Sequence, residues 1–489
     1  MPRVMLMCLI AGGIGRNLKE KLITMAIAGK HRGPDSFGVW TEGGVLKSDD
    51  FSKLSEIPDG RIGLLQCRLA MTGSKNFTQP FINDLALVHN GEIYNHAALR
   101  EYLEGRRVSF ESDVDSEVIL RLIEFLGEEH LSYPEIVKRL FWMLEGDYAV
   151  AFSDGERIYL FRDPMGIRPL YFSRNGLFAS EKKVLWAVGE KEVEPVQPGE
   201  LVVLEKNGVR RARLFSLENL KSKAKCERKD PVGGVEKLLR YAVRNRVSGK
   251  TGVLFSGGLD STLVAYLASQ YSDVVLYTAG TEDSPDTEWA RKVADHFGWK
   301  LREITFDIED VRDAVKRVIY AIEEPNPMNL AIGLPLYFAS ALASSDGTRV
   351  LLSGQGADEL FGGYAKYLER PELMEEELAL ISERNLARDD KIAMLNGVEG
   401  RYPFLALPVV SFALKLPLEA KIADGTRKVI LRKLALRLGI PEWIAGREKK
   451  AAQYGSRAQK LLEKIAREEG LTLREFAERL FRETFPNAF

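Results

Sequence analysis

Two short glycine-rich stretches combine residue types that suit the binding of a phosphate chain. The first, SGGLDS at residues 256–261, follows an apolar run and opens a segment with helical spacing. Gly257 and Gly258 let the main chain approach an anion closely, and the free N–H groups of a helix start attract phosphate oxygens. Ser256 and Ser261 add hydroxyl donors. The stretch lacks the lysine of GxxxxGK[ST], which excludes a Walker-type nucleotide site here.

The second stretch, SGQGADELFGGY at residues 353–364, also follows an apolar run and supplies Asp358 and Glu359. Carboxylates suit Mg²⁺, which proteins commonly hold with one or two acidic side chains and the phosphates of a nucleotide. Without a ligand, each stretch would be a capped helix start, and Glu359 would be a capping residue. Together the two stretches predict a nucleotide site with Asp260 and Asp358 as Mg²⁺ ligands.

Cys8 is a third candidate, and it lies in the short apolar run of MPRVMLMCLIAGGIG. Inside a core it would be an inert small hydrophobe. As the first residue of a mature chain it would carry a free α-amine, whose pKa of about 7.7–8.0 suits it to accept the thiol proton. With Met7 attached, that nitrogen is an amide and cannot act as a base. If Cys8 is to be the first residue, either translation starts at Met7 and this methionine is removed, which the position of Met7 directly before Cys8 favours, or a short propeptide is removed.

The elements that must position these residues differ between the two halves of the chain. Up to about Phe215, apolar and aromatic runs contain Asn-Gly or Asp-Gly pairs, as in LALVHNGEIYN, YAVAFSDGERIYLFRD, PLYFSRNGLFAS and ELVVLEKNGVRRARLF. These pairs predict tight turns between antiparallel strands. Apolar spacing near 3.6 adds helices over residues 17–29 and 115–126. We therefore expect an α+β domain over residues 8–215.

From about Val232, strands alternate with helices. TGVLF, DVVLYTAG, KLREITFD and TRVLLSG are buried-type strands that precede loops or helical runs. This alternation predicts right-handed crossovers and an α/β domain with a parallel sheet over residues 232–489. Ligands bind at the carboxyl ends of such strands, where both glycine stretches lie. Residues 216–231, polar and lysine-rich, are interpreted as a linker, and amphipathic helices are expected after Ser456.

The composition of the 489-residue chain excludes several classes of protein. Lys plus Arg total 69 against 70 for Asp plus Glu, so nothing indicates a nucleic acid or an anionic membrane as partner. Three separated cysteines and five scattered histidines fit neither a disulfide framework nor a catalytic zinc site. We expect no membrane span, because no apolar stretch approaches the ~18–20 residues that a span needs. We also expect a cytoplasmic protein.

With both glycine stretches in view, the chain resembles the glutamine-dependent asparagine synthetase family. SGGLDS is similar to its ATP-pyrophosphatase (PP-loop) motif, SGQGADELFGGY to its second nucleotide loop, and RDDKIAMLNGVEGRYPFL (388–405) to the stretch behind its active site. The first half resembles a class II glutamine amidotransferase domain, which is Ntn-hydrolase-like. The matching stretches are HRGPD (31–35), QPF (79–81), NGEIYN (90–95), SDVDSEVI (112–119), GDYAVAF (146–152) and RDPMGIRPLYF (162–172).

The resemblance implies two coupled reactions with glutamine, aspartate and ATP as substrates. Glutamine would be hydrolysed through a thioester, and aspartate would be activated by ATP and Mg²⁺ to a β-aspartyl-adenylate with release of pyrophosphate. Ammonia would then convert the adenylate into asparagine and AMP. Two alternatives stay open: an amide ligase for another carboxylate, resembling β-lactam synthetase, and a non-catalytic nucleotide- or glutamine-binding regulator. A homodimer also stays open.

The resemblance also assigns residues to these steps. The catalytic residues would be the nucleophile Cys8, the oxyanion hole formed by Asn90 and Gly91, and Gln355 and Lys449 in the second reaction. The residues expected to contact glutamine are Arg68, Leu69, Asn90, Gly91, Glu92 and Asp115. The residues expected to contact ATP are Leu254, Ser256, Gly257, Gly258, Asp260, Ser261, Ala279, Ser353 and Gly354. For Arg68, Glu92 and Asp115 the open alternative is surface ion pairing, and Lys450 competes with Lys449 for its role.

Two positions depart from the family pattern. Gln355 stands where the family usually has Glu, and a Gln side chain carries no charge and cannot act as a base. Ala406 replaces the Asp of the family's PFLD. If that Asp only caps or packs a helix, its loss matters little.

Overall fold

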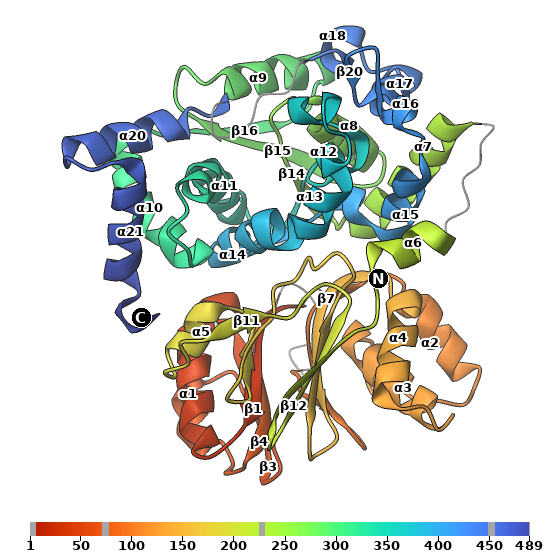
Figure 1. Ribbon diagram of the computed structural model, residues 1–489, viewed down its shortest axis with the longest axis vertical. Coiled ribbons are helices and arrows are strands. Elements are labelled where there is room, and N and C mark those ends of the chain that lie inside the picture. The colour runs from red at the N-terminus through yellow and green to blue at the C-terminus, as the bar shows by residue number, and fades with distance from the viewer. Residues whose placement is uncertain (1–5, 71–77, 224–229, 448–454, 489) are drawn as a thin grey trace. The chain divides into compact units, whose positions relative to one another are not determined.

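The structure is a computed structural model that describes residues 6–70, 78–223, 230–447 and 455–488 (Figure 1). The chain divides into two compact units, one formed by Met1–Ser216 with Phe485–Phe489 and the other by Leu217–Thr484.

The first unit contains two antiparallel sheets (Figure 1). The seven-stranded sheet has the order β11-β9-β10-β1-β4-β2-β3, and the six-stranded sheet has the order β13-β12-β8-β7-β6-β5. The first sheet comprises β1 Leu6–Ile14, β2 Ser36–Thr41, β3 Gly44–Ser48, β4 Ile62–Ala70, β9 Tyr171–Ser173, β10 Leu177–Ala179 and β11 Val193–Pro195. The second comprises β5 Phe81–Ile82, β6 Ala86–Ile93, β7 Gly146–Ser153, β8 Ile158–Arg162, β12 Glu200–Glu205 and β13 Gly208–Arg213.

Side-chain alternation along the strands gives this unit two cores. Ile10 and Leu64 of the seven-stranded sheet pack against Val88, Leu160 and Val202 of the other sheet. The opposite face of the seven-stranded sheet packs against α1 (Leu18–Gly29) and α5 (Lys182–Trp186). Helices α2 (His96–Glu104), α3 (Asp115–Gly127) and α4 (Tyr133–Met143) lie beside the six-stranded sheet (Figure 1). The layers run helix, sheet, sheet, helix, which confirms the predicted α+β class.

Three of the four predicted glycine turns are present, and one is wrong. Gly155 and Gly176 have φ values of 89° and 85° at the turns that end β7 and β9, and Gly208 follows the turn after β12. At Asn90–Gly91 the strand β6 runs straight through both residues. Gly91, at φ 135°, is required there because a Cβ would lie 1.9 Å from the carbonyl oxygen of Asp147 on β7.

The second unit is built on a five-stranded parallel sheet with the order β16-β15-β14-β17-β18, as predicted. Its strands are β14 Lys250–Leu254, β15 Asp273–Gly280, β16 Leu301–Thr305, β17 Val350–Leu352 and β18 Glu399–Arg401. The strand order reverses between β14 and β17, which makes this point the topological switch of the sheet. SGGLDS follows β14 and SGQGADELFGGY follows β17. The sheet therefore brings the two glycine stretches to one crevice.

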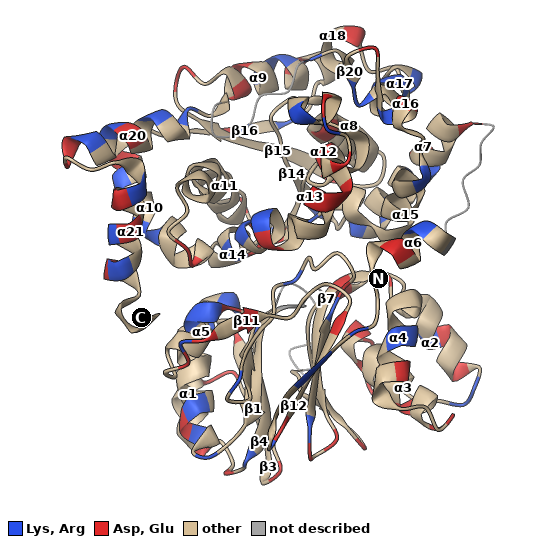
Figure 2. Ribbon diagram, in the orientation of Figure 1, with Lys and Arg blue, Asp and Glu red and all other residues tan. Residues whose placement is uncertain are grey.

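The helices of the second unit cover both faces of this sheet (Figure 1). They are α6 Leu217–Lys223, α7 Pro231–Arg246, α8 Leu259–Ala268, α9 Pro285–Phe297, α10 Ile308–Ile322, α11 Pro327–Ser345, α12 Ala357–Phe361, α13 Leu373–Ile381, α14 Ala387–Leu395, α15 Leu407–Lys415, α16 Leu418–Lys421, α17 Val429–Arg437, α18 Glu442–Ala445, α20 Ala458–Glu468 and α21 Leu473–Thr484. A short hairpin, β19 Ile422–Ala423 and β20 Thr426–Arg427, joins α16 to α17. Figure 2 shows both signs of charge along α20 and α21, as expected for amphipathic surface helices.

Two segments differ from the sequence-based expectation. The segment interpreted as a linker contains α6. Leu220 of this helix is buried, and its carbonyl oxygen accepts a hydrogen bond from Ser411 Oγ at 3.1 Å. Helix α11 is 19 residues long and apolar enough to cross a membrane by length and composition, although no such stretch was expected. Half of it is buried in this unit, so the structure uses it as a core helix.

Candidate active sites

Cys8 lies in β1, directly opposite Arg68 on β4, and its side chain is 0% exposed. Burial raises the pKa of its thiol to about 12. The positive charges of Arg68 and Arg32 and a hydrogen bond from the Leu69 main chain act in the opposite direction. In this environment the thiol is neutral near pH 7, so it becomes a nucleophile only if a neighbouring base removes its proton.

Asn90 on β6 is oriented by Cys8 itself. Its Oδ1 accepts a hydrogen bond from the Cys8 N–H at 3.3 Å, which leaves its Nδ2 group to face elsewhere. This Nδ2 is buried, and among the described residues it has no hydrogen-bond partner. A buried N–H₂ group without a partner is costly, and a ligand oxygen would satisfy it. The arrangement fits the predicted oxyanion hole.

The residues predicted to bind glutamine lie on β4, β6 and α3. Arg68 and Leu69 belong to β4, Glu92 to β6, and Asp115 is the first residue of α3. All four are buried, which excludes surface ion pairing as the explanation for Arg68, Glu92 and Asp115. Asp115 Oδ2 accepts a hydrogen bond from the N–H of Ile93 at 2.8 Å, and this contact ties the start of α3 to the end of β6.

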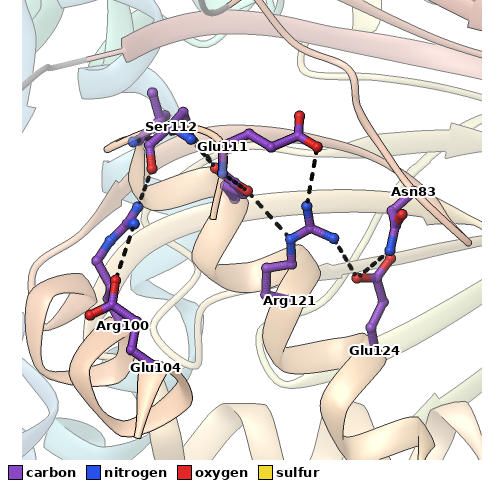
Figure 3. Close-up of polar contacts among 9 residues, drawn as sticks. Asn83, Arg100, Glu104, Glu111, Ser112, Arg121 and Glu124 are labelled. Atoms are coloured by element: carbon purple, nitrogen blue, oxygen red, sulfur yellow. Dashed lines mark hydrogen bonds and ion pairs between the residues drawn. The ribbon is translucent and has the colours of Figure 1, made fainter. Parts of the chain in front are cut away.

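A polar cluster holds the loop that leads into α3 (Figure 3). Glu117 accepts hydrogen bonds from the main-chain N–H groups of Glu111 and Ser112 at 2.9 and 2.7 Å, and from the Ser112 hydroxyl at 2.6 Å. Arg121, one turn further along α3, contacts Glu117 at 3.3 Å. The cluster therefore fixes the loop just before Asp115. The other labelled members are Asn83, Arg100, Glu104 and Glu124.

Sequence reasoning missed the residues that lie behind Cys8. Gln66 Nε2 lies 2.8 Å from Cys8 Sγ, and Gln79 donates its main-chain N–H to Gln66 Oε1 at 3.1 Å. Gln79 in turn contacts the main-chain N–H of His89 at 2.5 Å and Ser116 Oγ at 2.9 Å. Gln79 belongs to the QPF stretch that carries part of the family resemblance. Gln66 gave no local signal, because a lone glutamine in a strand is common.

Arg32, from the HRGPD stretch, supports β1 from the other side. Its Nε lies 3.4 Å from the Cys8 carbonyl oxygen, and its Nη1 pairs with Glu181 at 2.9 Å. His31 and Lys183 also pair with Glu181, at 2.8 and 2.7 Å. Burial would raise the pKa of Glu181, but the neighbouring side chains of Lys183, His31 and Arg32 hold it well below its ordinary value. This charged cluster anchors the main chain at Cys8.

A cavity of about 290 Å³ lies at the switch point of the second unit. Most residues predicted to contact ATP line it, together with Gln355 and Asp358: they are Leu254, Ser256, Gly258, Asp260, Ser261, Ala279, Ser353 and Gly354. Gly257, at φ 66°, instead presents its carbonyl oxygen to the indole N–H of Trp289 on α9, at 3.0 Å. Lys449 and its competitor Lys450 lie outside the described residues, as does Cys226.

Arg447, which also lines the cavity, contacts the loop at residues 256–261. Its Nη1 donates to the Ser256 carbonyl oxygen at 2.5 Å, and its Nη2 pairs with Asp286 at 2.8 Å. Two loop carbonyl groups, those of Ser256 and Gly257, are therefore engaged by side chains outside the loop. The start of α8 has no side-chain cap, which leaves its N–H groups for an anion.

The two carboxylates predicted to bind Mg²⁺ do meet, but they share the ammonium group of Lys428. Its Nζ lies 2.5 Å from Asp260 Oδ2 and 2.6 Å from Asp358 Oδ1. Lys428 adopts a left-handed conformation at φ 57°, which is uncommon for a residue with a side chain and often marks a functional position. A Cβ at Gly363 would lie 1.8 Å from Asp358 Oδ1, so this close packing requires glycine.

This geometry suits a cation bound by two carboxylates. Asp260 Oδ1 is buried and has no hydrogen-bond partner within the described part of the chain. No group of three His, Cys, Asp or Glu side chains that could hold a metal occurs among the described residues. A Mg²⁺ ion at Asp260 and Asp358 would therefore take its remaining ligands from nucleotide oxygens and water, as Mg²⁺ commonly does.

The two departures from the family pattern have different settings. Gln355 lines the cavity, and its main-chain N–H donates to Ser353 Oγ at 3.2 Å. Ala406 is the N-cap residue of α15 and is buried. Asp is a preferred N-cap residue, so the setting of Ala406 favours the interpretation that the family's Asp caps this helix.

The two units define a chain in which a glutamine amidotransferase fold precedes a nucleotide-binding α/β fold. A family model described as glutamine amidotransferase domain matches residues 7–212, and one described as asparagine synthase matches residues 234–381 and 371–487. A putative glutamine-hydrolysing asparagine synthetase of Methanocaldococcus jannaschii is 34% identical over 96% of this chain and 98% of its own length. This chain belongs to the glutamine-hydrolysing asparagine synthetase family.

Two further relatives are similar over most of their length. A probable glutamine-hydrolysing asparagine synthetase of Schizosaccharomyces pombe is 32% identical over 85% of this chain and 76% of its own. Asparagine synthetase B of Escherichia coli is 28% identical over 90% of this chain and 79% of its own. The matches span both units in each case.

Proposed function

We propose that this protein makes asparagine from aspartate, ATP and glutamine, and releases glutamate, AMP and pyrophosphate. One observation carries the proposal: a single chain combines the buried Cys8 and the Asn90 Nδ2 group, which has no hydrogen-bond partner among the described residues, with a glycine-rich loop at the switch point of a parallel sheet. We assign glutamine hydrolysis to residues 8–215 and amide formation to residues 232–489, joined by residues 216–231.

In the first reaction, the Cys8 sulfur attacks the side-chain carbonyl carbon of glutamine. The base is the α-amine of Cys8 after removal of Met7, since Asn90 Oδ1 already accepts a hydrogen bond from this nitrogen and would hold it in place. Asn90 Nδ2 and the Gly91 N–H stabilise the oxyanion. Ammonia leaves, and water hydrolyses the resulting thioester.

Buried charges explain how glutamine would be oriented in this site. Arg68 binds the α-carboxylate, a task that suits the two parallel donors of a guanidinium group. Glu92 and Asp115 bind the α-ammonium group. Because all three side chains are buried, their charges act through a poorly screening medium and select a substrate with both charges.

In the second reaction, the β-carboxylate of aspartate attacks the α-phosphorus of ATP, and pyrophosphate leaves. The loop at 256–261 holds the phosphate chain. Mg²⁺, when bound by Asp260 and Asp358, neutralises charge on the phosphate oxygens. The Lys428 ammonium must then leave these carboxylates, and it becomes available to the negative pyrophosphate. Lys449 is proposed to offset charge during adenylation, and Gln355 to hydrogen-bond the nucleotide without acting as a base.

The test is an assay of purified protein with ATP, Mg²⁺ and glutamine, with and without aspartate. We expect asparagine, AMP and pyrophosphate in equal amounts, all dependent on aspartate. Pyrophosphate release that needs another carboxylate would assign the protein to a different amide ligase. Nucleotide binding without turnover would assign it to the regulators.

The state of the amino terminus is tested separately by intact-mass measurement on a glutaminase-active preparation. We expect the mature chain to begin at Cys8, because only then does its nitrogen have a lone pair that accepts a proton. A fully active chain that retains Met7 would contradict this part of the proposal. We also place the enzyme in the cytoplasm, where free thiols such as Cys8 and Cys67 stay reduced.

A further inference from the structure

We propose that Gln66 is a catalytic residue of the glutamine-hydrolysing site and acts as a hydrogen-bond donor to the Cys8 sulfur. This inference rests on the proposed role of Cys8 as the nucleophile. Gln66 lies on β4, is fully buried, and places its Nε2 2.8 Å from Cys8 Sγ. No motif of the sequence pointed to it.

The orientation of the Gln66 amide follows from its other neighbours. The main-chain N–H of Gln79 can only donate, so the atom that faces it at 3.1 Å must be the Gln66 oxygen. The carbonyl oxygen of His89 can only accept, and it lies 3.4 Å from Gln66 Nε2. Both contacts therefore require the N–H₂ group to be the end that faces the sulfur.

The neighbours that orient Gln66 are themselves held in place. Gln79 Oε1 accepts the main-chain N–H of His89 at 2.5 Å, and Gln79 Nε2 lies 2.9 Å from Ser116 Oγ. His89 Nδ1 lies 2.9 Å from the same hydroxyl. Because these groups are all buried, the donor at Cys8 is already oriented before substrate arrives and needs no reorganisation.

A hydrogen-bond donor at this position offsets the destabilisation of the buried Cys8 thiolate. Burial disfavours the thiolate, and the Asp115 charge adds to this effect, whereas Arg68, Arg32 and the Leu69 N–H oppose it. A hydrogen bond to a charged partner is stronger than one to a neutral partner, so Gln66 stabilises the thiolate more than the thiol.

The proton and electron pairs balance without a contribution from Gln66. The thiol proton passes to the Cys8 α-amine, a sulfur electron pair forms the C–S bond, and the carbonyl π pair moves to oxygen. When the oxyanion collapses, the C–N bond breaks, and the amine returns its proton to the departing ammonia. Gln66 donates a hydrogen bond throughout and transfers no proton.

Titration of Cys8 alkylation tests the proposal directly. Iodoacetamide modification of Cys8, followed by peptide mass across pH 6 to 11, reports the thiolate fraction and does not require glutamine hydrolysis. Gln66→Met preserves size and removes the donor. We expect alkylation about tenfold slower than in the wild type throughout this pH range. The glutaminase kcat should fall with little change in KM.

Gln66→Glu separates a catalytic role from a structural one. It keeps the oxygen that accepts from Gln79 but turns a second oxygen toward the sulfur. The proposal predicts alkylation at least as slow as in Gln66→Met, because the donor is lost, and alkylation like that of the wild type would contradict it. Gln197→Ala in the same unit is the matched control and should leave the titration unchanged.

Two outcomes would overturn the proposal: an unchanged Cys8 titration in Gln66→Met, or a wild-type titration in Gln66→Glu. A near-ultraviolet circular dichroism spectrum and a thermal unfolding curve like those of the wild type show that each variant is folded; asparagine synthesis from ammonium chloride would report only on the other unit, which holds the nucleotide cavity. If the wild type lacks glutaminase activity while the Gln66 variants still shift the titration, the proposed function fails, and only the hydrogen bond from Gln66 to the Cys8 sulfur stands.

Discussion

At the scale of single residues, Lys428 occupies the place between Asp260 and Asp358 where a divalent cation would bind. Its ammonium group is within 2.6 Å of an oxygen of each carboxylate. A lysine and a metal ion compete for the same oxygens, so the nucleotide-free protein has to break two ion pairs before it can bind Mg²⁺ there. Binding of nucleotide offers the ammonium group new negative partners and lowers this cost.

The Lys428 prediction uses Mn²⁺ as a probe for Mg²⁺. Without nucleotide, Lys428→Met should bind Mn²⁺ at least tenfold more tightly than the wild type, because its two carboxylates are no longer neutralised. Electron paramagnetic resonance of free Mn²⁺ measures the difference. Asp260→Asn added to Lys428→Met should abolish the gain. Equal Mn²⁺ binding by wild type and Lys428→Met would show that the lysine does not guard the site.

Lys421, at the end of α16, gives a prediction about pH. Burial lowers its pKa from 10.5 to about 8; Lys221 acts in the same direction and Glu375 opposes it. Between these two pH values the unfolded chain binds more protons than the folded one, so the free energy of unfolding rises with pH. Below pH 8 the lysine is charged in both the folded and the unfolded state. Its burial then lowers the free energy of unfolding by the full amount that corresponds to the difference between the two pKa values, roughly 3 kcal/mol.

Lys421→Met should therefore stabilise the protein at pH 7, by about 1–3 kcal/mol, and remove the rise in stability between pH 8 and 10. Denaturant unfolding at pH 7, 8, 9 and 10 measures both effects. Lys433→Met, at an exposed position of α17, is the control and should change neither. A loss of stability at pH 7 in Lys421→Met would mean that the buried ammonium is favourably paired.

At the scale of elements, the start of α3 positions Asp115. Asp115, the proposed glutamine ligand, follows a loop whose Glu111 and Ser112 main-chain N–H groups donate to Glu117. Figure 3 shows Glu111 and Ser112 in this loop. The first turn of the helix thus carries both the proposed substrate ligand and the side chain that holds the preceding loop.

Glu117→Gln should weaken glutamine binding. One amide oxygen can still accept from Glu111, but the new N–H₂ group would face the donors of Ser112 and leave them unsatisfied. We expect KM for glutamine to rise about tenfold while kcat stays within about twofold, because the loop carries a substrate ligand and not the nucleophile. Steady-state glutaminase kinetics measure this split.

The matched control for Glu117→Gln is Glu104→Gln. Glu104 is also drawn in Figure 3, but it lies on α2 and its contact is with Arg100 at 3.8 Å on a more exposed surface. It should leave both constants unchanged. A fall in kcat alone for Glu117→Gln would contradict the view that this cluster acts by placing Asp115.

At the scale of the whole molecule, the two reactions belong to different units. The described residues of the nucleotide cavity all lie between 217 and 484, and Cys8 with its neighbours lies in the first unit. Cys8→Ala should therefore abolish asparagine synthesis from glutamine and retain, within about twofold, synthesis from ammonium chloride. Asparagine formation with each nitrogen source measures this. Loss of both activities would show that the nucleotide site depends on the amidotransferase nucleophile.

Contiguous motifs made much of both sites predictable from the sequence. SGGLDS, SGQGADELFGGY and SDVDSEVI each place their chemical groups by local main-chain geometry, so their type and spacing indicate chemistry directly. The alternation of strands and helices predicted the parallel sheet for the same reason. Local signals failed where the cause was not local. The Asn90–Gly91 pair predicts a turn, but Gly91 lies within a strand, where the nearby main chain of β7 leaves no room for a Cβ.

The sequence by itself determined the two fold classes and the two glycine loops, because each depends on residues within a few positions of one another, whereas Cys8 was predicted as the nucleophile only through the family resemblance. Only the tertiary structure decided that Gln66 faces the Cys8 sulfur and that Lys428 lies between Asp260 and Asp358. Gln66 and Cys8 are 58 residues apart in the sequence, and Lys428 and Asp260 are 168 residues apart. The contacts within these two pairs depend on strand pairing and on the path of distant loops. Neither of these produces a recognisable spacing or composition in the amino-acid sequence.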